Sequence, residues 1–132
     1  SQEHELPIYV LADFDPWGFY IYSVLKFGSI NLAHMSGSMT LNNARFLGIT
    51  ADDIENYGLK KNLIAFKDVD VTRLKQLQNY EWFKDNKAWQ RQFKMMATMK
   101  AKAEIQALSG RGISFITEKY LPEKIKKGEY LQ

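Results

Sequence analysis

The sequence contains no cysteine, and this absence excludes disulfide bonds, thiolate zinc sites and thiol nucleophiles. It also lacks a signal-peptide pattern and any apolar run long enough to cross a bilayer. We therefore expect a soluble protein without a membrane partner, located inside the cell. The two histidines show no metal-ligand spacing, and no phosphate-binding glycine loop or Ser/His/Asp arrangement is found. Carboxylates and cations remain as the main candidates for carrying chemistry.

The 132 residues are enough for one domain with a single core, and a hydrophobic content of 45% with 14% aromatic residues is typical of a folded globule. The net charge of +3 is a mild excess, which is compatible with a nucleic-acid partner but does not establish one. No internal repeat or low-complexity tract divides the chain. We treat residues 1–132 as one unit.

The segment from Pro7 to Gly18 is the strongest functional signal. The apolar run over 8–12 predicts a strand buried on both faces, and it ends in Asp13 and Asp15. Asp15 suits a helix N-cap and Pro16 suits the first helical position. Asp13 should therefore lie at the carboxyl end of a central strand, where open α/β sheets bind ligands. Two neighbouring carboxylates repel each other unless a cation or proton intervenes, and Mg²⁺ prefers such oxygen ligands.

The rest of the chain predicts an α/β fold whose second half is rich in helices. A strand, a helical crossover and a second strand favour parallel pairing. Thr50 caps one helix with Asp53 at the capping-box position, and Asp70 is expected to cap another. The expected elements after Asp15 are helices over 16–27 and 30–35 separated at Gly28-Ser29, a strand over 45–49, and helices over 51–57, 71–78, 87–108 (in one or two pieces), 113–120 and 122–127.

A basic stripe is expected within the run over 87–108. Apolar residues share one helical face: Trp89, Phe93, Met96, Ala103 and Ala107. The opposite face carries Lys87, Arg91, Lys94 and Lys102. These cations could follow a DNA backbone, although a solvated helix face is the commoner explanation of such a stripe. The spacing of the aromatic residues here, including Trp82 and Phe83, favours core packing over base stacking.

Several segments of the chain resemble the A subunit of topoisomerase VI, the archaeal-type IIB DNA topoisomerase that is related to the meiotic double-strand-break transesterase. The first segment runs from Asp13-Phe-Asp-Pro-Trp-Gly18 to Ala33. The others are 44–58, 78–83, 102–109 and 118–125. Asp-x-Asp alone is a weak signal, but Asp-x-Asp-Pro-Trp-Gly together with the later segments is specific.

The resemblance implies a Toprim domain, which is a Rossmann-like, mostly parallel sheet flanked by helices. In that family one glutamate and the Asp-x-Asp pair hold Mg²⁺ for strand cleavage and religation, and Asp13 and Asp15 match the pair. The family's glutamate lies on an earlier strand and its tyrosine nucleophile lies in an upstream winged-helix domain. Nothing in this chain matches either of them. Residues 1–132 are thus expected to be a partial Toprim domain, without a catalytic nucleophile and inactive in DNA cleavage by itself.

The resemblance also implies an assembly. The intact protein is expected to be the DNA-cleaving A subunit of an ATP-dependent type II topoisomerase, an isomerase that acts on double-stranded DNA. Its expected protein partners are a second A subunit, in a homodimer, and an ATPase B subunit, in an A2B2 heterotetramer.

Two other functions stay open. A phosphohydrolase of the haloacid-dehalogenase type also places Asp-x-Asp after an apolar strand, and would use Asp13 as nucleophile and Asp15 as acid/base. That family usually has a small pair such as Gly-Thr where this chain has Pro16-Trp17, and we find no convincing downstream lysine and acidic pair. The third possibility is a non-catalytic interaction module, in which the acidic pair only forms a turn and caps a helix.

Overall fold

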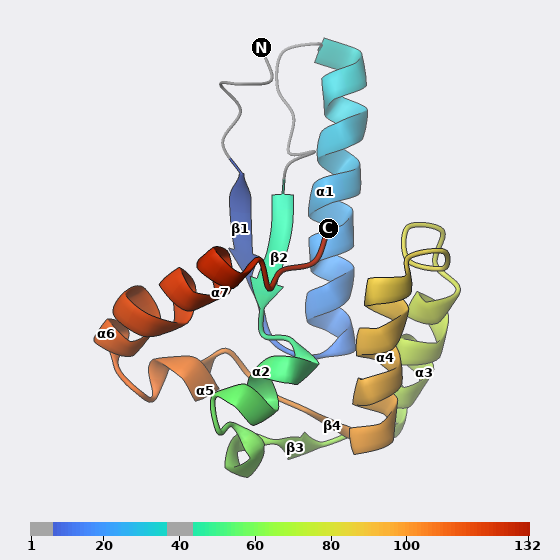
Figure 1. Ribbon diagram of the computed structural model, residues 1–132. Helices are drawn as coiled ribbons and strands as arrows, with labels where there is room; N and C mark the ends of the chain where they lie inside the picture. Colours follow the sequence, from blue (N-terminus) through green and yellow to red (C-terminus); the bar gives the residue numbers. More distant parts are fainter. Residues whose placement is uncertain (1–6, 37–43) are drawn as a thin grey trace.

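Two parallel strands lie at the centre of the fold, with the long helix α1 beside them (Figure 1). The computed structural model describes residues 7–36 and 44–132. The strands are β1, Ile8–Leu11, and β2, Ala44–Gly48, and α1, Pro16–Ser36, connects them in sequence. The parallel pairing predicted for these strands is confirmed. Val10 lies opposite Phe46, and a shift in register then brings Leu11 opposite Gly48.

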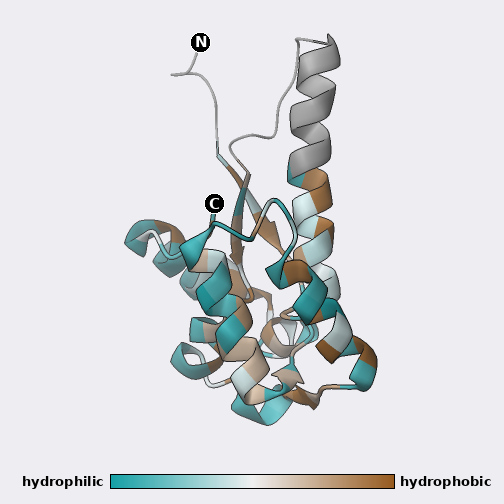
Figure 2. Ribbon diagram, turned by 90° about the vertical axis from the view of Figure 1, so that its right-hand side faces the viewer, coloured by the Kyte–Doolittle hydropathy of each residue, from teal (hydrophilic) through white to brown (hydrophobic). Residues whose placement is uncertain are grey.

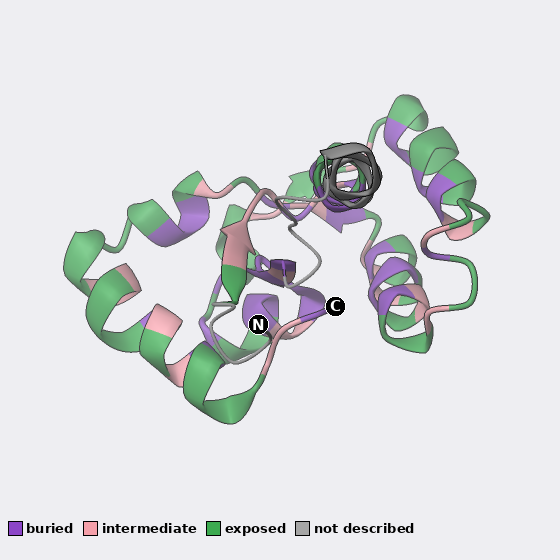
Figure 3. Cartoon of the chain, turned by 90° about the horizontal axis from the view of Figure 1, so that it is seen from above, coloured by how far each residue is buried: buried purple, intermediate pink, exposed green. Residues whose placement is uncertain are grey.

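Short elements and helices form the rest of the described chain. They are α2 (Ala51–Asn56), a 3-10 turn (Lys60–Asn62), β3 (Ile64–Ala65), α3 (Asp68–Gln78), α4 (Lys87–Met99), β4 (Ala101–Lys102), α5 (Gln106–Ser109), α6 (Ile113–Phe115), a π-helical turn (Ile116–Tyr120) and α7 (Leu121–Lys127). Seen from above, α3 and α4 lie to one side of the strands and α5–α7 to the other, with buried residues turned inward (Figure 3). The α/β class with a helix-rich second half is as predicted. No helix in the two described ranges is long and apolar enough to span a membrane.

An aromatic cluster forms much of the core between the strands, α1 and α4. Trp89 is fully buried, and its ring lies 5.2 Å from that of Phe19, 5.1 Å from Phe46 and 4.9 Å from Phe83, centroid to centroid. These separations are in the range of favourable aromatic pairs. Hydrophobic colouring accordingly concentrates on the strands, whereas the outer helices carry hydrophilic faces (Figure 2). The prediction that Phe83, Trp89 and Phe93 are core residues is confirmed.

The prediction that the first strand is buried on both faces is wrong. Ile8 is exposed and the other residues of β1 are only partly buried, whereas four of the five residues of β2 are buried. The reason is that β2 has neighbours on both edges: β1 on one, and an antiparallel bridge from Phe46 to Leu131 on the other. Among the described residues β1 pairs only with β2, so β2 is the more central strand.

Three predicted boundaries also need correction. Gly28-Ser29 does not end the first helix, because α1 continues to Ser36. Asp70 is not the N-cap of α3, which begins at Asp68; Asp70 lies in its first turn and accepts a hydrogen bond from Lys67 N at 2.9 Å. The run over 87–108 is in two helical pieces, as the prediction allowed, but the strand between them was not predicted. Lys100, in the left-handed conformation at φ 52°, ends α4, and β4 follows.

The helix after β2 begins and ends as predicted from its caps. Thr50 Oγ1 accepts from Asp53 N, and Asp53 Oδ2 accepts from Thr50 N at 3.0 Å, which is the reciprocal capping box. Gly58, at φ 65°, takes the left-handed conformation beyond the end of α2.

Candidate metal site and its surroundings

Asp13 is held between two backbone pairings. On its amino-terminal side, Ala12 N donates to Gly48 O at 2.9 Å and Ile49 N donates to Ala12 O at 2.9 Å, so the link to β2 extends past β1. On its carboxyl-terminal side, Phe14 and Ala103 exchange backbone hydrogen bonds of 2.8 and 3.0 Å. Asp13 therefore lies at the carboxyl end of the parallel pair, as predicted, with its backbone fixed from two directions.

Each carboxylate of the pair uses one oxygen to accept a backbone hydrogen bond. Asp13 Oδ1 accepts from Ile105 N at 2.7 Å. Asp15 Oδ1 accepts from Gly18 N at 2.5 Å, which is the predicted N-cap of α1. Within the described ranges, no hydrogen bond uses the second oxygen of either group. Both side chains are partly buried, and in each the fold orients one oxygen while the other accepts no hydrogen bond from the described residues.

The surroundings of Asp15 disfavour its ionised form. Burial raises the pKa of Asp15 above its usual value, and the charges of Asp13 and Asp70 raise it further. The Gly18 N–H and the Lys102 ammonium act in the opposite direction. A cation bound between the carboxylates would relieve the same repulsion.

Asp70 and Lys102 belong to these surroundings, and the sequence did not place them there. Lys102 Nζ lies 2.9 Å from Asp70 Oδ2, in a pair that is largely buried, and both charges act on Asp15. Lys102 lies in β4 rather than on α4, so its predicted place on the basic helix face is wrong. The signal available in the sequence is weak, because a helix cap also explains an aspartate at position 70.

The donor set fits a hard divalent cation. Mg²⁺ usually takes one or two protein carboxylates and completes its shell with waters and phosphate oxygens. Asp13 and Asp15 supply two such carboxylates. No cluster of three or more His, Cys, Asp or Glu side chains that could hold a metal occurs in the part of the chain that the structure describes. A cation here would therefore depend on ligands beyond these two.

Gly18 is required by the close approach of α1 to the acidic pair. A Cβ atom at this position would lie 2.5 Å from Asp13 O and 3.0 Å from Asp15 Oδ1. Any side chain would therefore push the backbone that carries Asp13 away from the helix cap. This explains in physical terms why glycine follows the Asp-x-Asp-Pro-Trp sequence.

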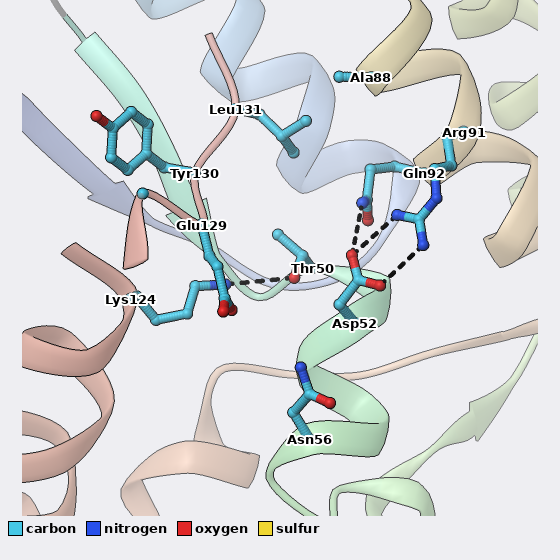
Figure 4. Close-up of a pocket in the computed structure, with 11 residues that line it drawn as sticks. Thr50, Asp52, Asn56, Ala88, Arg91, Gln92, Lys124, Glu129, Tyr130 and Leu131 are labelled. Carbon is cyan, nitrogen blue, oxygen red and sulfur yellow. Dashed lines mark hydrogen bonds and ion pairs between the residues drawn. The ribbon is translucent and has the colours of Figure 1, made fainter. Parts of the chain in front are cut away.

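The predicted basic stripe is only partly present. Lys87, Arg91 and Lys94 lie on α4 and are exposed, with Lys84, Asp85 and Gln90 beside them around one shallow hollow. Arg91, however, donates from both terminal nitrogens to Asp52, each at 3.0 Å. Figure 4 shows that Arg91 and Gln92 both contact Asp52, which lines a pocket together with residues of the chain after α7. Lys87 and Lys94 therefore offer their charges to a ligand more readily than Arg91.

Comparison with known proteins agrees with the sequence resemblance. The family model for the Toprim domain of the topoisomerase 6 A subunit/Spo11 matches residues 1–125. Relatives named as the A subunit of type 2 DNA topoisomerase 6 are similar over nearly the whole chain: 41% identical in Hyperthermus butylicus, covering 100% of this chain and 36% of the relative, and 42% identical in Pyrococcus horikoshii, covering 98% and 36%. The chain thus spans about a third of the length of these relatives. It belongs to the Toprim-domain family of Spo11 and the topoisomerase 6 A subunit.

Proposed function

We propose that this chain is the metal-binding Toprim portion of a DNA-cleaving topoisomerase A subunit, with Asp13 and Asp15 as its Mg²⁺ ligands. Family membership and the oriented acidic pair support this proposal. The observation that carries it is the arrangement of the two carboxylates, each of which accepts a backbone hydrogen bond through one oxygen and none from the described residues through the other. Residues 1–132 would then be part of a Toprim domain whose glutamate and tyrosine nucleophile are supplied by a longer parent chain.

Residues of this chain would bind the cation and orient it toward the DNA. Asp13 is the expected direct ligand, because it lies at the strand end and its backbone is fixed on both sides. Asp15 caps α1 and more readily acts through a water molecule, because burial and the charges of Asp13 and Asp70 disfavour its ionised form. When bound, the cation would position a DNA phosphate and offset the negative charge that develops on it. Lys102 would add positive charge on the same side.

The substrate and partners follow from the same proposal. Inside the cell, the intact subunit would cleave double-stranded DNA through its tyrosine, and it would work in an assembly with a second A subunit plus an ATPase B subunit. Lys87 and Lys94 are proposed contacts to the DNA backbone, and Arg91 is a weaker one because Asp52 already binds it. This chain alone should not nick DNA, and tyrosine-dependent nicking by it would contradict the proposal.

Calorimetric titration with Mn²⁺ tests the metal site. Asp13→Asn and Asp15→Asn each remove a charge but keep an oxygen that can accept from Ile105 N or Gly18 N, and asparagine remains a good N-cap. We expect the wild-type chain to bind, Asp13→Asn to lose binding and Asp15→Asn to weaken it. Asp85→Asn, at an exposed aspartate of the turn before α4, is the matched control and should bind like wild type. Equal binding by wild type and Asp13→Asn would remove the metal assignment.

The phosphohydrolase alternative predicts a different activity. It requires turnover of a chromogenic phosphate ester with loss in Asp13→Asn, whereas our proposal requires none. The interaction-module alternative predicts that no divalent cation binds. No observation in the described chain favours either alternative.

A further inference from the structure

A pocket with aromatic walls begins one residue after the acidic pair. It lies between the first turns of α1 and the second half of α3 with the turn that follows, and its cavity of about 370 Å³ is within the range typical of small-molecule sites. The residues that form its walls include Pro16, Trp17, Tyr20, Arg73, Leu77 and Tyr80. Pro16 directly follows Asp15, so the pocket and the acidic pair share the amino-terminal end of α1.

The aromatic side chains of this pocket are exposed. Trp17 is 50% exposed, Tyr80 39% and Tyr20 37%, whereas Trp89 in the core is fully buried. The Trp17 and Tyr20 rings are tilted by 32° with centroids 5.4 Å apart, and the Tyr80 ring stands edge-on to Tyr20 at 6.1 Å. Large aromatic groups left in water next to a functional site typically mark a surface that takes a ligand. Their faces are suited to stacking against a flat ring.

The charge of the pocket selects the kind of ligand. The guanidinium carbon of Arg73 lies 5.3 Å from the Trp17 ring centroid, in a cation–π contact. The other polar wall residues, Gln76 and the two tyrosines, are neutral, and none of the described residues that line the pocket carries a carboxylate. Aromatic faces combined with one cation and no acid match a nucleotide, whose base stacks and whose phosphate is negative.

We propose that this pocket holds an unstacked nucleobase of the DNA strand whose phosphate is bound at Asp13 and Asp15. The base stacks on Trp17, with Tyr20 and Tyr80 as further walls, and Arg73 contacts the adjoining phosphate. This inference rests on the proposed function, because it assumes that the acidic pair binds a DNA phosphate. It adds a separate base-binding site that would fix the position of the strand along α1.

Fluorescence titration with a short oligothymidylate tests the base contact. Trp17 is the tryptophan exposed at the pocket, whereas Trp82 is partly buried and Trp89 is fully buried, so stacking should quench mainly the Trp17 emission. Trp17→Ala removes the ring on which the base stacks and should weaken binding by roughly tenfold, and Tyr80→Ala should also weaken it. Trp17→Phe should keep most of the affinity while losing the quenching. An abasic oligonucleotide of equal length should bind wild type as weakly as the thymidylate binds Trp17→Ala.

The matched control is Ile113→Ala, which truncates another exposed apolar side chain, 78% exposed on α6, and should leave binding unchanged. Equal affinity of wild type and Trp17→Ala, or of the abasic and the base-containing oligonucleotide, would overturn the proposal. So would a Trp17→Ala variant that binds the oligonucleotide normally but loses self-association in sedimentation, because the pocket would then bind a second copy of the chain.

The two proposals can fail separately. Titrations in EDTA report the base contact without the metal, and Mn²⁺ calorimetry of Asp13→Asn reports the metal without the base. If Asp13→Asn binds Mn²⁺ like wild type, the metal assignment fails. The base contact in the pocket is decided by the Trp17 variants and the abasic oligonucleotide, whatever the outcome for the metal.

Discussion

Replacing Lys124 by methionine should destabilise the fold strongly, because this lysine is buried in an ion pair with Asp53. Lys124 is 1% exposed and Asp53 is fully buried, and their charged atoms lie 2.6 Å apart. Asp53 also accepts from the Tyr120 hydroxyl at 2.5 Å and from Thr50 N at 3.0 Å. Burial, together with the charge of Asp53, raises the pKa of Tyr120, so its hydroxyl remains a donor. The cluster joins α7 to the start of α2.

The magnitude follows from the burial of the pair. Removing the ammonium leaves a carboxylate in the interior without its cation, and breaking such a pair costs about 3–5 kcal/mol. A domain of this kind has a free energy of unfolding of roughly 5–15 kcal/mol, so Lys124→Met should remove a large part of it. Methionine fills similar volume, which separates the electrostatic effect from loss of packing. Urea unfolding followed by circular dichroism measures the difference.

A double-mutant cycle distinguishes the buried pair from a general effect on α7. Asp53→Asn combined with Lys124→Met removes both charges, so the two costs should not add, and we expect a coupling of about 1–3 kcal/mol. Lys127→Met, at an exposed lysine of the same helix, should change stability by no more than about 0.5 kcal/mol. A cost below about 1 kcal/mol for Lys124→Met, or strictly additive costs in the double variant, would refute the reasoning.

Three further predictions test other parts of the structure. Gly18→Ala should lower the free energy of unfolding by about 1–3 kcal/mol and weaken Mn²⁺ binding, because the new Cβ would lie 2.5 Å from Asp13 O. Gly110→Ala, at an ordinary φ of −60°, is the control, and equal effects of the two variants in urea unfolding and calorimetry would contradict the reasoning. Burial, with a smaller effect of Arg45, lowers the pKa of Lys26 from 10.5 to about 8. Between these pH values the unfolded chain holds the proton more tightly than the folded chain, so the free energy of unfolding should rise with pH by up to about 3 kcal/mol. Lys26→Met should not show this rise. If the difference in free energy of unfolding between wild type and Lys26→Met is the same at pH 7.5 and at pH 10, the prediction is refuted. Lys87→Gln and Lys94→Gln should each reduce the slope of log affinity for duplex DNA against log salt concentration by about 1, and Arg91→Gln should reduce it less because Arg91 is paired with Asp52. Equal slopes for wild type and all three variants would show that these residues do not contact DNA.

Local signals predicted those parts of the fold that local interactions decide. The capping box of Thr50 and Asp53 depends on residues three apart, and Gly58 ends the helix through its own conformation, so both helix ends could be predicted from the sequence. The strand before Asp13 and the cap at Asp15 were readable for the same reason. Glycine and serine at 28–29 were misleading, because a helix tolerates one glycine at a cost of about 1 kcal/mol when the rest of the helix is stable.

Contacts between distant segments could not be read in this way. The pattern over 87–108 looks helical because Ala103 and Ala107 continue the apolar spacing of α4, but pairing with Ile64 and Ala65 makes Ala101 and Lys102 a strand. Lys102 consequently faces Asp70 rather than solvent on a helix. Lys124 looks solvated because lysines surround it, and its burial depends on Asp53, 71 residues earlier.

The acidic pair itself illustrates how a local motif depends on distant residues for its geometry. The sequence identifies Asp13 and Asp15, but the atom that fixes the Asp13 carboxylate is the backbone nitrogen of Ile105, 92 residues later. That nitrogen is in place because Ala103 pairs with Phe14 through two backbone hydrogen bonds, directly after Asp13. Because a backbone donor is independent of side-chain identity, no residue type at 105 could have indicated this role. The helix-rich second half therefore orients the site, and the chain from β4 to α5 is as much a part of it as the strand that carries the carboxylates.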